Sequence, residues 1–263
     1  MNNLQMVGLT DTGRIRAQNE DSIACVPDAG LVVVADGMGG HQAGEVASKL
    51  AAETITRHII NTLTSTDSHN GFEAKMITDA IQLANRAIND LARQQPECAG
   101  MGSTVVVAVF HGDKLWVGHV GDSRLYRFRD GLLEQITLDH SVVQELISRG
   151  LVTPEEARHA ANKNLVTRAL GVDSTVTSDI SELALNDDDI YLLCSDGLND
   201  VLADGDIEMT LTENKRNIEA AAHQMIDTAN ERGGPDNISV ILVRAKRDFV
   251  RDQAALQKIR GQV

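Results

Sequence analysis

The sequence of 263 residues has no long apolar run. Its longest purely apolar segments, Leu31–Ala35 and Val105–Phe110, are far shorter than the roughly 20 residues with which a helix crosses a bilayer. The first ten residues, MNNLQMVGLT, contain neither the basic start nor the apolar core of a secretory signal. These absences argue against a membrane protein and predict a cytoplasmic one.

Cysteine and positive charge are also scarce. Cys25, Cys98 and Cys194 are odd in number and form no CxxC pair, so we predict small buried residues rather than a thiol nucleophile. The 38 acidic and 24 basic residues give a formal net charge of −14, which repels a nucleic-acid backbone. Such a surplus is typical of a solvated acidic surface, or of carboxylates reserved for divalent cations.

The strand-like runs outnumber the helical ones. Several, such as VVVAVF and ISVILV, are continuously apolar, which indicates strands covered on both faces. The strands are predicted at Met6–Thr10, Ser22–Val26, Leu31–Ala35, Thr104–Phe110, Lys114–Val120, Arg124–Arg129, Ile180–Leu185, Ile190–Cys194 and Ile238–Arg244. Amphipathic helices are predicted at Glu45–Leu63, Phe72–Gln94 and Ile218–Arg232.

The order of these elements predicts an α+β fold. Strands gather as hairpins, with HGDK and NDDD read as tight turns, and two helices follow one another, so we expect antiparallel sheets flanked by helices rather than a doubly wound parallel sheet. One domain is expected over residues 1–246. The polar, short-helical segment 139–171 between two strand clusters is predicted to be a flap or lid, and residues 247–263 a helical or frayed tail.

Five aspartates stand where predicted strands begin or end. A single Asp beside Gly is ordinary turn chemistry, but ADG at 35–37 and SDG at 195–197 repeat one strand-to-Asp-Gly junction. If these strand ends converge, the carboxylates can stay ionised together only when cations neutralise them. Oxygen ligands without a His or Cys cluster suit Mg²⁺ or Mn²⁺. The aspartates are Asp21, Asp36, Asp122, Asp196 and Asp236.

Six motifs in order then resemble the PPM family of metal-dependent protein phosphatases, the type 2C class, in its compact bacterial form. They extend over about residues 5–245, nearly the whole chain. The motifs are RAQNED (16–21), ADGMGG (35–40), GSTVVVAV (102–109), GHVGDSR (118–124), CSDGL (194–198) and GGPDNISVI (233–241). The family's fold implies a four-layer α-β-β-α sandwich of two antiparallel sheets, with helix pairs outside and a flap inserted.

The resemblance also implies a set of metal ligands for two or three Mn²⁺ or Mg²⁺ ions. Asp36 corresponds to the carboxylate that bridges two metals, and Gly37 to the residue that adds its carbonyl. Asp196 and Asp236 correspond to further ligands of one ion, and Asp122 to the acid that helps to hold a third, weaker metal. The remaining acidic pair, which ligates a metal or its water, is Glu20 and Asp21.

Basic and amide residues complete the implied site. Arg16 corresponds to the arginine that binds phosphate, a role that suits the planar, permanently charged guanidinium. Its alternative is a surface salt bridge. Arg124 is expected in an internal ion pair, and Asn19 and Asn237 are expected to hydrogen-bond around the ligands.

The proton donor is the point at which the chain departs from the family. Many eukaryotic members carry His directly after the Asp-Gly of ADG, but this chain has Met38. His41 is a candidate donor with a helix-capping role as its alternative, His140 is a second candidate, and a metal-bound water is a third.

The implied function is hydrolysis of phosphoserine and phosphothreonine monoesters. A hydroxide held between two metals would attack phosphorus in line, and the enzyme would act as a monomer that reverses the work of a bacterial Ser/Thr kinase on its substrates. Two alternatives stay open. One is a catalytically silent phosphoprotein-binding module. The other is a nucleotide-binding protein, although the glycine spacing around Gly37 is not GxGxxG and no GKS or GKT follows.

Overall fold

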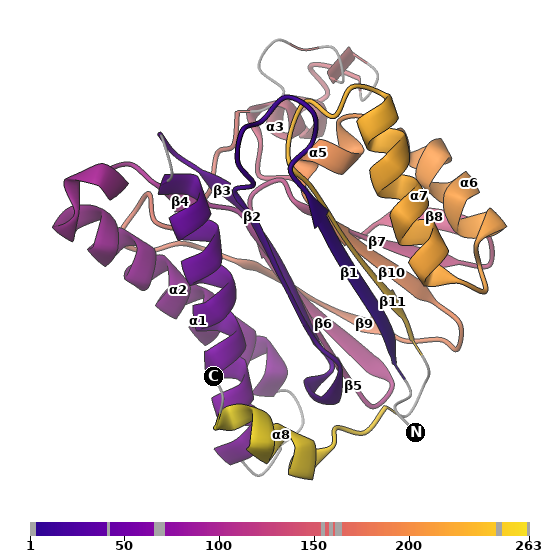
Figure 1. The fold of residues 1–263 in the computed structure, drawn as a ribbon, viewed down its shortest axis with the longest axis horizontal. Helices are drawn as coiled ribbons and strands as arrows, with labels where there is room; N and C mark the ends of the chain where they lie inside the picture. Colours follow the sequence, from indigo (N-terminus) through magenta and orange to yellow (C-terminus); the bar gives the residue numbers. More distant parts are fainter. Residues whose placement is uncertain are drawn as a thin grey trace.

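The computed structural model describes residues 4–40, 43–65, 72–153, 156–157, 160, 165–245 and 249–261. Within them the strands form two antiparallel sheets (Figure 1). In order, the first sheet consists of β1 (Gln5–Asp11), β11 (Ile238–Arg244), β10 (Ile190–Cys194), β7 (Arg124–Arg129) and β8 (Leu132–Gln135). The second consists of β2 (Asp21–Val26), β3 (Leu31–Met38), β5 (Val105–His111), β6 (Lys114–Val120) and β9 (Asp179–Ala184), with β4 (Gly102–Ser103) paired to β3.

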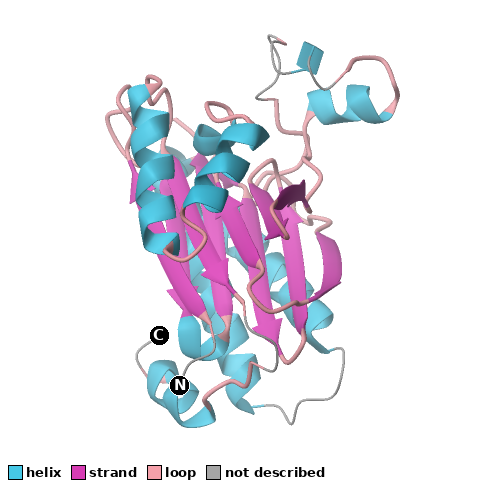
Figure 2. Cartoon of the chain, turned by 90° about the vertical axis from the view of Figure 1, so that its right-hand side faces the viewer, coloured by secondary structure: helices cyan, strands magenta, loops and turns pink. Residues whose placement is uncertain are grey.

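Helices cover the outer face of each sheet (Figures 1 and 2). The long helices α1 (Ala43–Ser65) and α2 (Phe72–Gln94) share one apolar core with the second sheet. The helices α6 (Asp204–Glu213) and α7 (Ile218–Glu231) share another core with the first sheet. A third core lies between the sheets. The predicted four-layer α-β-β-α sandwich is confirmed, and the antiparallel sheets exclude the doubly wound nucleotide-binding alternative.

The continuous apolar strands are covered on both faces, as predicted. In β3, Leu31 and Val33 pack in the core beneath α1 and α2, whereas Val32 and Val34 pack between the two sheets. All four side chains are fully buried. Because each apolar residue removed from water stabilises the fold by roughly 1.5–3 kcal/mol, a strand with two buried faces contributes on both sides and shows no alternation.

Helix α1 has a buried face with a spacing of four residues. Its first half presents Ala43, Ala47 and Ala51, and its second half Ile55 and Ile59. The small residues allow the beginning of the helix to lie against the end of β3, while the larger ones fill the core farther along. The sequence pattern therefore sets a close helix-to-strand approach next to Asp36.

Some local predictions need correction. The HGDK segment is a two-residue hairpin turn, with His111 opposite Lys114, but NDDD joins β9 and β10, which belong to different sheets. Cys98 and Cys194 are buried, whereas Cys25 is exposed on the edge strand β2. The short elements β4, β8 and α6 were not predicted. Helix α6 buries only three side chains, Ile207, Thr210 and Leu211, and shows no clear apolar stripe that the sequence could reveal.

The remaining helices mark the two ends of the sandwich. Helices α3 (Val142–Ser148), inside the predicted flap segment 139–171, and α5 (Asp196–Asn199) lie at one end, and α8 (Gln253–Arg260) lies at the other (Figure 1). Short 3-10 turns occupy Pro27–Ala29 and Pro96–Cys98. Among the residues that the structure describes, no helix has the length and apolar content to span a bilayer.

Candidate active site

Five strand ends bring the predicted aspartates to one end of the sandwich. Asp21 begins β2 and lies directly opposite Asp36 in the β2–β3 ladder. Asp122 follows β6, Asp196 follows β10 as the first residue of α5, and Asp236 lies two residues before β11. Neighbouring antiparallel strands alternate in direction, so the end of one and the start of the next meet at the same edge.

The electrostatics show that these carboxylates act on one another. Burial raises the pKa of the Asp36 carboxyl well above its usual range, and repulsion from Asp21, Asp196, Asp122 and Asp236 raises it further. Burial also raises the pKa of Asp196 well above its usual range, and repulsion from Asp122 is the largest contribution after burial. The structure therefore gathers all five acids into one acidic centre, in which Asp236 has a basic partner, Arg16.

Asp21 joins the two sheets beneath this centre. Its Oδ2 atom accepts hydrogen bonds from the hydroxyls of Ser195 and Ser239, both at 2.7 Å, across from the first sheet. Its Oδ1 atom is buried and has no hydrogen-bond partner. Burial raises the pKa of Asp21 to about 6, although the two hydroxyls oppose the shift. A buried carboxylate oxygen without a donor is a place that a cation can fill.

Asp122 lies beside an ion pair that compensates a different acid. Burial and the charge of Asp139 raise the pKa of Asp122 to about 6, and Arg124 opposes this. The Arg124 guanidinium binds both oxygens of Asp139, at 2.7 to 3.1 Å, and donates to the hydroxyl of Tyr126 at 2.8 Å. The expected internal ion pair of Arg124 is thus present, and its partner is Asp139 rather than Asp122.

Gly37 has a packing reason that the sequence did not reveal. A Cβ atom on Gly37 would stand 2.0 Å from the carbonyl oxygen of Gly44 in the first turn of α1. No side chain fits there, so α1 reaches the end of β3 only because residue 37 is glycine. Met38, the next residue, pairs with Gly102 and lines an open depression of about 510 Å³ whose wall includes residues 166–169.

Arg16 lies on the loop between β1 and β2 and faces Asp236. Its Nη2 atom donates to Asp236 Oδ2 at 2.7 Å, and this hydrogen bond raises the pKa of the guanidinium. The side chain of Arg16 is 49% exposed, so the guanidinium remains accessible to an anion from solvent. The ion pair that the sequence offered as the alternative role of Arg16 is therefore present, and its phosphate-binding role stays a prediction.

Two asparagines hold this loop in place. Asn237 Nδ2 donates to the backbone carbonyls of Thr12 and Gln18, both at 2.9 Å, and its Oδ1 accepts the N–H of Glu20 at 2.8 Å. Asn19 accepts the N–H of Asp21 at 3.1 Å. The bonds of Asn237 attach both sides of the Arg16 loop to the start of β11, and the bond of Asn19 closes a short turn before β2. A supporting role for these amides around metal ligands stays a prediction.

Glu20 directly precedes Asp21 and is less buried than that residue. It is partly buried, and its carboxylate accepts the N–H of Gly44 at the beginning of α1. Burial raises its pKa, Arg16 lowers it, and Asp236 raises it. Glu20 is thus close enough to influence the acidic centre while it is held by the helix end.

His41 and His140 are the two histidines that the sequence offers as proton donors. His41 lies outside the described residues. His140 is buried, and burial together with His119 and Arg168 lowers its pKa to about 4, so its imidazole is neutral at pH 7. Its ring faces Gly121 and Asp179. This environment gives no imidazolium that could protonate a leaving group, so the geometry disfavours His140 as the acid.

Hydroxyl residues within the quoted motifs are the supporting groups that sequence reasoning missed. Ser103 donates to the carbonyl of Asp36 at 3.0 Å, and Thr104 accepts the N–H of Asp36 at 3.1 Å. Ser195 and Ser239 hold Asp21 as described. Their only signal was their position within the GST, CSD and NIS segments of these motifs.

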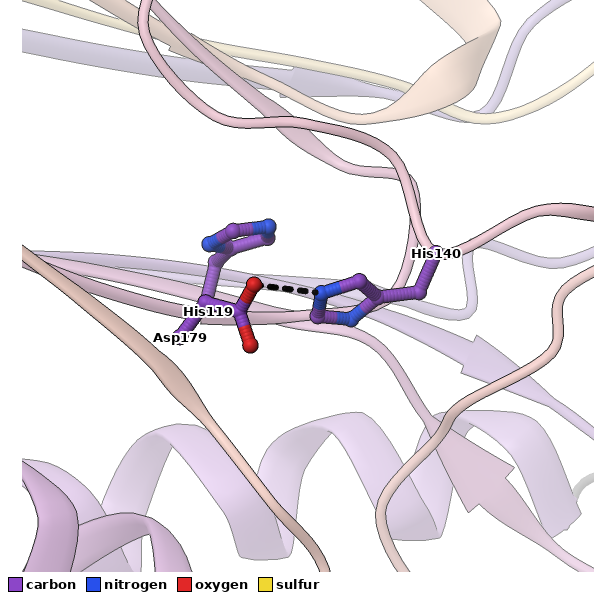
Figure 3. A group of neighbouring side chains, drawn as sticks. All are labelled: His119, His140 and Asp179. Atoms are coloured by element: carbon purple, nitrogen blue, oxygen red, sulfur yellow. Dashed lines mark ion pairs between the residues drawn. The ribbon is translucent and has the colours of Figure 1, made fainter. Parts of the chain in front are cut away.

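The acidic centre fits divalent cations by its donor set. It offers carboxylate oxygens alone, one of them buried without a partner, and its negative charges raise each other's pKa values. Its carboxylate oxygens are more widely spaced than the potential ligand atoms of a second cluster nearby. Among the described residues, only His119, His140 and Asp179 place three potential ligand atoms all within 4.8 Å of one another (Figure 3).

A four-layer sandwich with aspartates converging at one edge is the architecture of a metal-binding domain. Similarity to known proteins identifies its family. The model of the protein phosphatase 2C family matches residues 14–242. The chain belongs to this family.

Relatives with similar sequences cover most of the chain. Serine/threonine protein phosphatase PstP of Mycobacterium tuberculosis is 39% identical over 240 residues, which is 91% of this chain. The chain spans only 44% of the length of that relative. Serine/threonine phosphatase stp of Listeria monocytogenes is 37% identical over 248 residues, which cover 92% of this chain and 95% of the relative.

Solved structures agree with the fold. A crystal structure of the catalytic domain of serine/threonine protein phosphatase PstP in complex with two manganese ions is 37% identical to this chain, with a TM-score of 0.81. The match covers 92% of this chain and 97% of that one. The family resemblance and the fold predicted from the six motifs are confirmed.

Proposed function

We propose that this protein is a metal-dependent phosphatase that hydrolyses phosphoserine and phosphothreonine in other proteins. The observation that carries the proposal is the gathering of four other aspartates around Asp36. Burial raises the pKa of Asp36, and repulsion from these four carboxylates raises it further. The relatives named above, which are serine/threonine phosphatases, and the two manganese ions of one of them support it.

The acidic centre would hold the cations. Asp36 would bridge two of them with help from the carbonyl of Gly37, and Asp196 and Asp236 would complete one ion. Asp122 would contribute to a third, and Asp21 would ligate a metal or a coordinated water. When bound, Mn²⁺ or Mg²⁺ neutralises the carboxylates, polarises a phosphoryl oxygen and acidifies a coordinated water.

The chain's own residues would orient the phosphate. Arg16 is the accessible cation beside Asp236, and its planar guanidinium can bind two phosphoryl oxygens at once. Asn237 and Asn19 keep the Arg16 loop attached to β11 and β2, so the guanidinium stays in register with the acidic centre. Positioning and charge neutralisation account for most of the rate enhancement in phosphoryl transfer.

Other parts of the prediction belong to this proposal. His41 stays a prediction as proton donor, and Met38 lines the depression next to the flap segment. The substrates would be products of a Ser/Thr kinase. A cytoplasmic location, a monomeric state and one domain over residues 1–246 also stay predictions.

Hydrolysis of a phosphothreonine peptide tests the proposal. We expect Mn²⁺-dependent release of phosphate that a chelator abolishes, and a loss of kcat/KM of about 10³-fold, near 4 kcal/mol, in Asp36→Asn. Asp113→Asn, which removes one exposed carboxylate from the β5–β6 turn, is the matched control and should keep full activity.

Two results would contradict the proposal. Turnover that survives the chelator would remove the metals from the reaction. A wild-type protein that binds the phosphopeptide in calorimetry but releases no phosphate would instead be the silent binding module.

A further inference from the structure

The cluster of His119, His140 and Asp179 lies beside the acidic centre and has no role in the proposed reaction. His119 belongs to β6, Asp179 begins β9, and His140 precedes α3 (Figure 3). The two imidazole rings are stacked, with centroids 4.5 Å apart and planes inclined by 19°. Both histidines are almost completely buried. Two imidazoles and a carboxylate at this spacing are a ligand set that zinc commonly takes.

The hydrogen bonds around the rings argue against a metal. His119 suits one, because its Nε2 lies 2.9 Å from the carbonyl of Leu138, a contact that places the proton there and leaves Nδ1 available. His140 does not, because its Nδ1 accepts the N–H of Gly121 at 3.1 Å. Its proton is therefore on Nε2, the atom that faces Asp179 Oδ2 at 3.4 Å, where a metal would need a lone pair.

A nearby guanidinium points the same way. Arg168 Nη1 donates to Asp179 Oδ1 at 2.8 Å, so the carboxylate already has a cationic partner. Burial, His119 and Arg168 together lower the pKa of His140 to about 4, which keeps the imidazole neutral at pH 7. A neutral ring with one fixed tautomer is suited to hold a backbone group rather than an ion.

The group that His140 holds is the peptide before a predicted metal ligand. Besides accepting the N–H of Gly121, His140 donates its own backbone N–H to the carbonyl of Gly121 at 2.9 Å. Gly121 has a φ of +106°, and a Cβ there would lie 2.6 Å from the Cβ of Thr104. The loop that carries Asp122 therefore packs closely against Thr104 on one side and is hydrogen-bonded to His140 on the other.

Thr104 extends this contact to the bridging aspartate. Its hydroxyl lies 2.6 Å from the hydroxyl of Ser123 and accepts the N–H of Asp36, while its own N–H donates to the carbonyl of Asp36 at 2.8 Å. His140 also has a contact away from Gly121, since its backbone carbonyl accepts the N–H of Thr167 at 2.7 Å. His140 therefore connects Thr167 of the flap segment with the Asp122 loop directly and with Asp36 through Thr104.

We propose that His140 is a positioning residue, which fixes the Asp122 loop through the acceptor at Nδ1 and so sets how tightly the acidic centre binds its weakest cation. The inference rests on the proposed function for the meaning of Asp122. It makes the attachment of the flap segment a determinant of metal affinity, because the same residue holds Thr167.

A matched pair of variants separates this role from simple packing. His140→Asn places an amide oxygen where Nδ1 accepts from Gly121, whereas His140→Gln extends past that point toward Asp179 and loses the acceptor. Both variants remove the stacked ring, so both should lower the melting temperature to a similar extent. Calorimetric titration with Mn²⁺ at pH 7.5 should show the weakest binding step at least fivefold weaker in His140→Gln and within twofold of wild type in His140→Asn.

Kinetics provide a second readout. Hydrolysis by His140→Gln should need more Mn²⁺ for half-maximal activity and should recover most of the wild-type kcat at saturating Mn²⁺, because Asp122 itself is intact. Equal Mn²⁺ affinities in the two variants would overturn the inference. Zinc that copurifies with the wild type and is lost from both variants would overturn it too, in favour of a metal at the histidines.

The inference and the proposed function can fail separately. If the wild type shows no Mn²⁺-dependent hydrolysis, the proposed function fails, while a difference between the two variants in Mn²⁺ titration still supports the positioning role. If the wild type is active but the variants bind Mn²⁺ alike, only the positioning role fails.

Discussion

At the end of the sandwich near α8, buried acids have basic partners, whereas at the end near α5 they mostly face other acids. Asp189, 1% exposed, binds Arg129 through both oxygens at 2.6 and 2.8 Å. Burial alone would raise the pKa of Glu73, but His111 and Arg251 bring it below its usual value. The pKa of Asp36 moves the opposite way.

The difference distinguishes acids that hold the fold together from acids that wait for a ligand. A buried carboxylate with a matched base is compensated within the chain, so nothing further is needed at that site. A buried carboxylate whose neighbours are also acidic destabilises the fold until a proton or a cation arrives. Proteins retain such arrangements where function requires them.

The largest expected effect concerns the compensated end. Asp189→Asn removes the charge that Arg129 binds and one acceptor for the N–H of Asn186, so we expect a loss of about 3 kcal/mol in the free energy of unfolding. Urea denaturation measures it. Asp188→Asn, an exposed neighbour whose φ of 66° suits asparagine, is the control and should change stability by less than about 0.5 kcal/mol. Activity per folded molecule should persist in both.

Arg16 tests whether an ion pair at the acidic end behaves like those at the other. The Arg16–Asp236 pair is exposed, 49% and 29%, so its loss in Arg16→Ala should change stability by less than about 1 kcal/mol. The KM for a phosphopeptide should rise at least about tenfold, near 1.4 kcal/mol or more, because the phosphate loses its bidentate guanidinium partner. A loss in Mn²⁺ affinity as large as the loss in substrate affinity would place Arg16 in a structural role.

The pH dependence of metal binding sharpens the comparison further. The pKa values of Asp21 and Asp122 are both raised to about 6, so below pH 6 a cation must displace protons from them. We expect Mn²⁺ affinity, measured by calorimetry, to increase about tenfold between pH 5.5 and pH 7.5, with release of protons at the lower pH. A flat profile over this range would show that neither carboxylate takes part in binding.

Much of the fold and the identity of the acids followed from the sequence. Apolar runs such as Leu31–Ala35 specify strands buried on both faces, and each motif places its aspartate at a strand end, where antiparallel pairing gathers them. Strand position by itself does not separate Asp189 from Asp236, since each adjoins a strand; it is the motif at 233–241 that singles out Asp236. Only the fold brings Arg129 to the buried carboxylate of Asp189, and only the fold places Asp236 beside Asp36 with an exposed arginine, Arg16, as its partner.

The supporting contacts were also beyond the sequence. Thr104 and Asp36 are 68 positions apart, and His140 and Gly121 are 19 apart, so no local pattern links them. Helix α6 escaped prediction because its stabilising contacts are few and its apolar residues form no regular stripe. The packing of Gly44 against Gly37 likewise depends on two elements meeting in space.

The stability of Asp36→Asn without metal tests the central claim most directly. Because burial and repulsion raise the pKa of Asp36 in the native state above its value in the unfolded chain, the carboxyl lowers stability above about pH 4, and a neutral amide removes this cost. At pH 7.5 in chelator, the free energy of unfolding of the variant should be about 1 kcal/mol higher than that of the wild type. Added Mn²⁺ should stabilise the variant far less than it stabilises the wild type. A variant less stable than the wild type in chelator would contradict the account.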